Sequence, residues 1–128
     1  MPPQQYNMEI LTLIIKDNFF DQILDGTKKE EFREIRPNSQ SKYCELDEEG
    51  YCKEQDGILL PRKYDAIRFL AGKYEKGRRE AIVAVSSSDI ELFVDENGEY
   101  IEYEHAGEVY VAAQVKYGLG KIMETRNV

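Results

Sequence analysis

The sequence predicts a mainly β protein (α+β), folded as a small closed or half-closed β-barrel with one short N-terminal helix and an acidic loop insertion. About seven short segments have the composition and length of strands, whereas a single early segment has helical spacing. No internal repeat or low-complexity tract interrupts them. Many short strands with little helix favour a small barrel over a doubly wound sheet.

The first strand and the helix are expected within residues 9–25. Residues 9–16 form a β-branched apolar run, which is typical of a central strand. Residues 18–25 follow with a helical pattern, and Asp17 or Asn18 is a suitable N-cap. Its apolar side chains, which we expect in the core, are Phe19, Phe20, Ile23 and Leu24.

A second strand is expected over residues 28–35, followed by a long irregular region. Residues 37–61 are predicted to be a loop insertion, either a functional flap or a poorly ordered segment. Within it, residues 43–53 can form an acidic hairpin around residues 47–50, which would turn Cys44 towards Cys52.

The remaining strands are expected in the second half of the chain. Asn97-Gly98 indicates a hairpin, because this pair readily supplies positive φ angles. Gly72 should end the strand before it, and residues 90–94 should continue or pair with the strand at 79–85. The expected strands cover residues 64–70, 79–85, 90–94, 100–103, 109–115 and 119–123.

Length and composition predict one domain over residues 8–125, preceded by a flexible tail at residues 1–7. A chain of 128 residues with 41% hydrophobic residues can bury a core without metal or disulfides. No apolar run is long enough to span a membrane and no basic, apolar signal segment is present, so we expect a cytoplasmic protein. The chain has two cysteines, Cys44 and Cys52, which are too few for a zinc knuckle, and we expect no metal and no cofactor. The two thiols are expected to be either reduced or a redox pair.

Charge is segregated along the chain, although the net charge is −8. This balance disfavours non-specific binding to a phosphate backbone. Residues 61–79 carry seven basic residues against Asp65 and Glu75, whereas residues 89–108 carry eight acids and no Lys or Arg. A molecule charged in this way can still present one basic cleft.

The stretch from Gly26 to Arg33 combines a helix stop with clustered charges. Gly26 occupies the position where a helix ends in the left-handed conformation. On a strand, Glu31 and Arg33 share one face, and a small bulge would bring Lys28 round to them. These residues predict either a salt-bridged edge strand or the lining of a binding cleft.

Gly26-x-Lys28-x-x-Glu31-x-Arg33, with the preceding strand and helix, resembles the signature of the ASCH domain family. Residues 64–74 and the closing run at residues 118–122 also resemble the family pattern. The resemblance implies a PUA-like β-barrel whose cleft binds RNA or a nucleotide-like ligand. It places Lys28, Glu31 and Arg33 in that cleft, with Lys16 at the matching strand end.

Some members of that family are enzymes, namely an amidohydrolase of acylated cytidine and a ribonuclease. The amidohydrolase branch has a threonine nucleophile where this chain has Glu31, and a carboxylate beside Lys28 and Arg33 is better suited to ion pairing. We therefore expect a non-catalytic RNA- or nucleotide-binding module. The alternative is a small hydrolase of a modified nucleoside or of RNA, with Lys28 as base and Glu31 as acid or orienting group.

Three further features bear on partners. The basic segment places Arg68, Lys73 and Tyr74 together as an expected single-strand nucleic-acid track, with a solvated face as the alternative. Tyr74 is the expected stacking residue. The acidic loop at residues 43–57 can serve a protein partner, whereas His105 has no evident partner and is expected to be inert.

Overall fold

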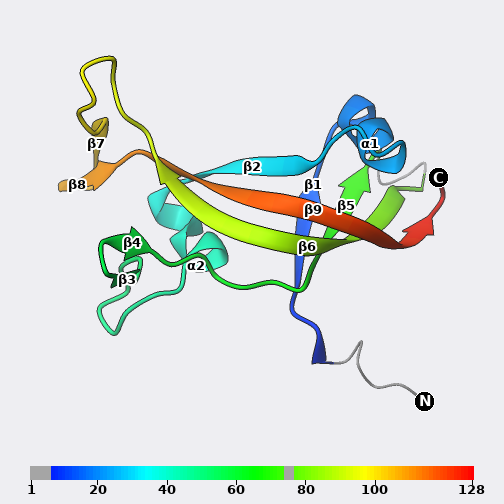
Figure 1. The fold of residues 1–128 in the computed structure, drawn as a ribbon, viewed down its shortest axis with the longest axis horizontal. Helices are drawn as coiled ribbons and strands as arrows, with labels where there is room; N and C mark the ends of the chain where they lie inside the picture. Colours follow the sequence, from blue (N-terminus) through cyan, green and yellow to red (C-terminus); the bar gives the residue numbers. More distant parts are fainter. Residues whose placement is uncertain (1–6, 74–76) are drawn as a thin grey trace. The chain divides into compact units, whose positions relative to one another are not determined.

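The computed structural model describes residues 7–73 and 77–128, and its secondary structure is mostly β, as predicted (Figure 1). Five strands form one mixed sheet in the order β1-β5-β6-β9-β2, and two further pairs stand apart, β3–β4 and β7–β8. This order leaves β1 and β2 at the edges, so the predicted barrel closure is not seen among the described residues. The elements are β1 (Ile10–Ile14), α1 (Asp17–Leu24), β2 (Glu30–Ile35), η2 (Pro37–Ser39), α2 (Gln40–Tyr43), β3 (Glu54–Gln55), β4 (Ile58–Leu59), β5 (Ala66–Ala71), β6 (Arg79–Leu92), β7 (Glu102–His105), β8 (Glu108–Val111) and β9 (Ala113–Arg126).

The chain divides into two compact units. The first comprises residues 1–31, 63–87 and 118–128, and the second comprises residues 32–62 and 88–117. The division falls within β2, β6 and β9, so each of these strands contributes to both units. No helix of the described residues is long and apolar enough to cross a membrane.

The first unit is built on β1, β5 and the first part of β6. β1 runs parallel to β5, with Ile10 opposite Ala66, and β5 runs antiparallel to β6. The run at residues 9–16 does form a strand, but β1 lies at an edge of the sheet, so the prediction of a central strand is wrong. Its side chains alternate, because Leu11 and Leu13 are buried while Ile14 is exposed. The other buried apolar residues of this unit are Ile15, Phe20, Ile23, Ala66, Ile67, Phe69, Ala71, Ala81, Ile82 and Val83.

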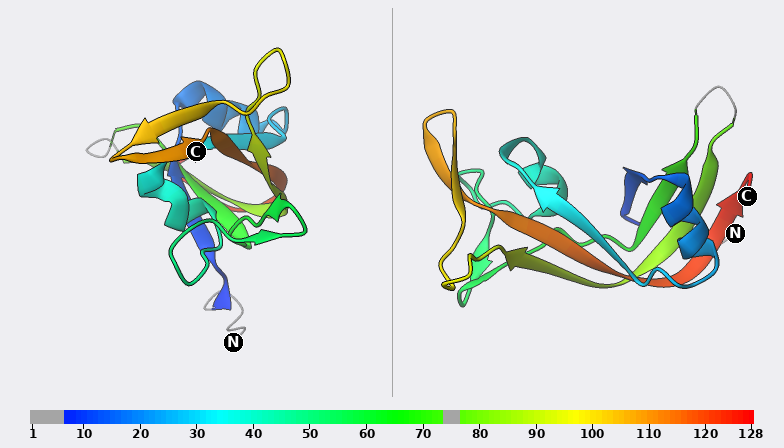
Figure 2. Two further views of the ribbon diagram at one scale, coloured as in Figure 1. Left: turned by 90° about the vertical axis from the view of Figure 1, so that its left-hand side faces the viewer. Right: turned by 90° about the horizontal axis from the view of Figure 1, so that it is seen from above.

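Helix α1 forms where helical spacing predicted it, and it lies beside β5 and β6 (Figure 2). Phe20 is fully buried, whereas Phe19 is 40% exposed, so only one of the two phenylalanines is a core residue. The N-cap is Lys16, and no side chain caps the helix. The predicted cap at Asp17 or Asn18 is therefore wrong, since both residues belong to the first turn.

Arg79 of β6 joins that strand to α1. Its guanidinium donates hydrogen bonds to Asp21 Oδ1 at 2.7 Å and to Asp17 Oδ1 at 3.3 Å, and it lies 4.5 Å from the centre of the Phe20 ring. The hydrogen bond to Asp21, with that to Asp17, raises the pKa of Arg79 above its ordinary value. The last cation of the basic segment thus contributes to packing of the fold.

The second unit contains the region predicted as a loop insertion at residues 37–61. The segment has secondary structure of its own: η2, α2, β3 and β4. A second helix, α2, was not expected. The acidic hairpin within it is confirmed, because Leu46 pairs with Cys52 across a turn closed by the hydrogen bond from the Gly50 N–H to the Asp47 carbonyl.

The later strands differ from prediction mainly in length and pairing. β6 runs without interruption from Arg79 to Leu92, so residues 90–92 continue the earlier strand, whereas Phe93 and Val94 lie beyond its end. The strand expected at residues 109–115 is divided between β8 and β9, and β9 continues for 14 residues through the strand expected at residues 119–123. The Asn97-Gly98 turn is confirmed, since Asp95 and Glu99 hydrogen-bond across it. However, β7 pairs with β8 and not with the segment before this turn. The strand expected at residues 100–103 meets that segment at the bridge between Val94 and Tyr100.

Candidate functional site

The segment between α1 and β2 is shaped by a left-handed glycine and a short hydrogen-bonded turn. Gly26 has φ +82°, as the helix stop predicted. Thr27 donates to the Asp25 carboxylate twice, from its hydroxyl at 2.6 Å and from its N–H at 2.9 Å. The Thr27 hydroxyl is the main reason that the pKa of Asp25 is lowered. The Lys28 N–H then bonds to the Gln22 carbonyl at 3.0 Å, which fixes where the lysine leaves the backbone.

Lys28 and Glu31 form an ion pair. Lys28 Nζ lies 3.0 Å from Glu31 Oε1, and these side chains are only 17% and 7% exposed. The Lys28 ammonium also lies 5.4 Å from the centre of the Phe19 ring. A carboxylate and an aromatic ring beside the ammonium restrict its position, as a preorganised ligand group requires.

A cavity of about 140 Å³ lies beside this pair, within the first unit. Lys28 and Lys29 border it together with Gly26, where an added Cβ would meet only the Lys29 ammonium, at 4.0 Å. The remaining wall is mostly apolar and consists of Ile23, Val83, Leu119, Gly120 and Ile122. The site therefore combines two cations with an apolar wall, which suits an anion attached to an apolar or flat group.

β9 reaches this site through a backbone contact that the sequence pattern did not indicate. The Leu119 N–H donates to the Lys29 carbonyl at 2.8 Å. A Cβ on Gly120 would lie 3.3 Å from the Ala84 carbonyl oxygen, so glycine permits the close approach of β9 to β6. In the sequence, only the likeness to a family pattern distinguishes the closing run at residues 118–122, because no local pattern indicates which strand it pairs with.

The structure brings some of the expected ligand-binding residues together. Lys28 borders the cavity and Glu31 pairs with it. Arg33 is half-buried on β2 and belongs to the second unit. Lys16, at the start of α1, is exposed.

The expected nucleic-acid track is only partly available for binding. Arg68 of β5 already has an anionic partner on β6, because its Nε lies 3.7 Å from Glu80 Oε2. Lys73 is exposed after the left-handed Gly72. Tyr74, the expected stacking residue, lies outside the described residues.

The structure also shows the surroundings of His105 and the distribution of possible metal ligands. His105 belongs to β7, where it is exposed and makes a T-shaped ring contact with Tyr110, with 6.4 Å between ring centres, so the expectation that it has no partner is wrong. Over residues 7–73 and 77–128, no group of three or more His, Cys, Asp or Glu side chains is arranged to hold a metal ion.

The fold and the site define a small, mostly β protein with a lysine-bordered cavity at the end of its first helix. Comparisons of the chain with protein-family models, with curated proteins and with solved structures give no match. The chemistry of this cavity is therefore the basis for assigning a function.

Proposed function

We propose that this chain is an RNA- or nucleotide-binding module of the ASCH type, with a PUA-like fold and with its ligand held beside the Gly26–Glu31 segment. The observation that carries the proposal is Lys28, whose ammonium is held by the buried Glu31 at the edge of a cavity. A cation fixed in this way loses little side-chain entropy when it binds a phosphate oxygen. The likeness of Gly26-x-Lys28-x-x-Glu31-x-Arg33 to the family signature supports the same assignment.

The composition of the cavity also suits a nucleotide-like ligand. Lys28 and Lys29 supply positive charge, and the apolar side chains of Ile23, Val83 and Leu119 offer a surface for the face of a base or sugar. The ion pair favours binding over hydrolysis, because it engages the lysine that a hydrolase would need as its base.

Binding of fluorescent single-stranded RNA oligonucleotides, followed by anisotropy across a salt series, tests the proposal. We expect salt-sensitive binding that Lys28→Ala weakens, with a salt dependence reduced by about one unit for each lost phosphate contact. Lys53→Ala removes an exposed cation of the second unit and is the matched control. Competition by mononucleotides distinguishes a nucleotide pocket from an RNA surface.

Circular dichroism should confirm that each variant is folded at the assay temperature. The proposal fails if the folded wild-type protein binds neither oligonucleotides nor mononucleotides at low salt. Equal affinity for Lys28→Ala and wild type would remove Lys28 from the site.

A further inference from the structure

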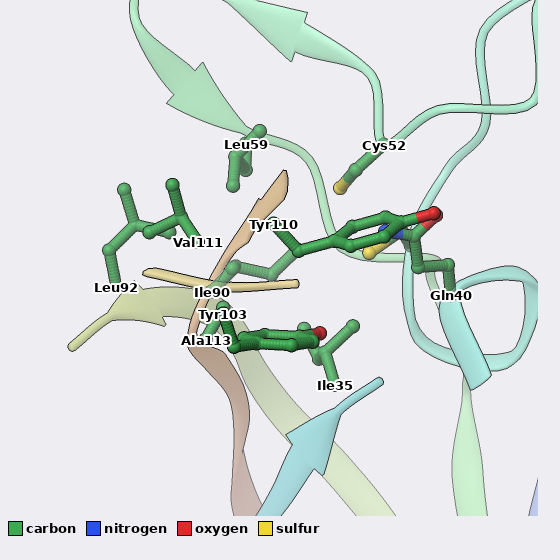
Figure 3. Close-up of a pocket in the computed structure, with 11 residues that line it drawn as sticks. Ile35, Gln40, Cys52, Leu59, Ile90, Leu92, Tyr103, Tyr110, Val111 and Ala113 are labelled. Atoms are coloured by element: carbon green, nitrogen blue, oxygen red, sulfur yellow. The ribbon is translucent and has the colours of Figure 1, made fainter. Parts of the chain in front are cut away.

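A second cavity, also of about 140 Å³, lies within the second unit, and both cysteines border it (Figure 3). Its wall is otherwise mostly apolar and aromatic. The lining residues are Ile35, Gln40, Cys44, Cys52, Leu59, Ile90, Leu92, Tyr103, Tyr110, Val111 and Ala113. Figure 3 shows the Cys52 side chain directed towards the cavity and the Tyr110 ring. The Tyr103 and Tyr110 rings stack with 5.7 Å between their centres and form a flat wall.

The backbone around the cysteines fixes their proximity. Leu46 pairs with Cys52, and the Lys53 N–H bonds to the Glu45 carbonyl at 2.7 Å. Cys44 is two residues before Leu46, so Cys44 and Cys52 are diagonal neighbours on one face of this hairpin. The turn itself is held by Asp47 Oδ1, which accepts hydrogen bonds from two backbone N–H groups of the turn.

The two thiols are diagonal neighbours and differ in environment. Cys44 is almost completely buried, whereas Cys52 is partly exposed at the cavity. The hydrogen bond between them raises the pKa of Cys44 and lowers that of Cys52, and burial raises the pKa of Cys44 further. The arrangement thus provides one accessible thiol that ionises readily and one enclosed thiol beside it.

We propose that Cys44 and Cys52 form a thiol–disulfide exchange site that reacts with low-molecular-weight disulfides entering this cavity. The Cys52 thiolate attacks one sulfur of the small disulfide, forms a mixed disulfide and releases the first small thiolate. The Cys44 thiol gives its proton to that thiolate, and the resulting Cys44 thiolate attacks the Cys52 sulfur. The second small thiolate leaves and takes a proton from solvent. The protein dithiol loses two electrons and the small disulfide gains them, so the exchange is balanced.

The size and lining of the cavity point to small disulfides as the reactant class. A cavity of this size and apolar character accommodates a group no larger than a small aromatic ring. Oxidation would remove the thiol hydrogen bond and covalently link the two sides of the acidic hairpin.

Incubation of the whole chain with bis(2-hydroxyethyl) disulfide, an uncharged small disulfide, tests the proposal by intact-protein mass spectrometry. We expect the wild type to lose two hydrogens, to show a Cys44–Cys52 link in peptide maps, and to recover its original mass with dithiothreitol. Cys44→Ser should stop at the mixed disulfide on Cys52, because the hydroxyl can replace the hydrogen-bond donor but cannot displace the small thiol. Cys52→Ser should react far more slowly, since its remaining thiol is buried.

Cys44→Ala is a second variant that keeps the test informative if the serine is poorly accommodated. It should also stop at the mixed disulfide, and it should form this adduct more slowly than Cys44→Ser at neutral pH. Wild-type protein that retains both thiols, or that accumulates a mixed disulfide without the internal link, overturns the proposal.

Discussion

Lys28 Nζ lies 3.0 Å from Glu31 Oε1, and removing this lysine would take one charged partner away from an enclosed carboxylate. We expect Lys28→Met to lower the free energy of unfolding by about 1–3 kcal/mol, because a desolvated charge that loses a partner is costly. Adding Glu31→Gln should recover part of this loss. Urea unfolding of the single and double variants measures the coupling, and strictly additive changes would argue against an energetic link.

The two neighbouring phenylalanines of α1 allow a test of how this helix packs in the first unit, because one is buried and the other is exposed. Phe20 is fully buried, whereas Phe19 is 40% exposed. We expect Phe20→Ala to cost about 3–5 kcal/mol and Phe19→Ala about 1 kcal/mol, since the cost grows with the apolar area that the side chain buries and with the cavity that its removal leaves. Thermal and urea unfolding measure both changes. Equal costs would contradict the placement of α1 against the sheet.

Gly118 of β9 packs closely against two serines of β6. A Cβ at this position would lie 2.7 Å from Ser86 Oγ and closer still to Ser87 Oγ. We expect Gly118→Ala to destabilise the fold by about 1–3 kcal/mol through overpacking. In the Ser86→Ala/Ser87→Ala background, where the hydroxyls are absent, the same substitution should cost much less. A double-mutant cycle from urea unfolding gives the coupling, and no coupling would mean that the serines do not restrict this position.

The reactivity of Cys52 should have a distinct pH dependence. Its pKa is lowered mainly by the hydrogen bond from Cys44, and the thiolate is the reactive species. Alkylation by iodoacetamide should therefore reach half of its maximal rate at a pH below the ordinary thiol value of about 8.5. Cys44→Ala should move this midpoint upward. A midpoint that the substitution does not change would show that Cys44 does not stabilise the thiolate.

The sequence pattern predicted the local structure well where alternation and turn chemistry agreed. The helix ended by Gly26 and the turn at Asn97-Gly98 both follow from residues whose backbone preferences are strong. The length of β9 was not predicted, because the expected strands leave a gap at residues 116–118. In the structure this glycine remains extended and provides room for the β6 serines.

Prediction of the candidate site was limited by contacts between distant parts of the sequence. Alternation along the strand placed Glu31 and Arg33 on one face. The bulge expected for Lys28 is wrong, because β2 begins at Glu30 and Lys28 reaches Glu31 from the segment before the strand. Leu119 is about 90 residues away in the sequence, and no periodic pattern indicates which strand it meets. The closeness of Cys44 and Cys52 was predictable because a local turn produces it.

The parallel ladder between β1 and β5 also affects the order in which the molecule can fold. Ile10 has its partner at Ala66, and the preceding Glu9 is likewise held by a distant residue, since its N–H bonds to Asp65 Oδ2 at 2.8 Å. During synthesis, the first strand must therefore leave the ribosome well before its partner exists. β5 and β6 pair over a much shorter separation, so the chain-closure entropy favours their association first. The N-terminal strand would then add to a hairpin that is already formed.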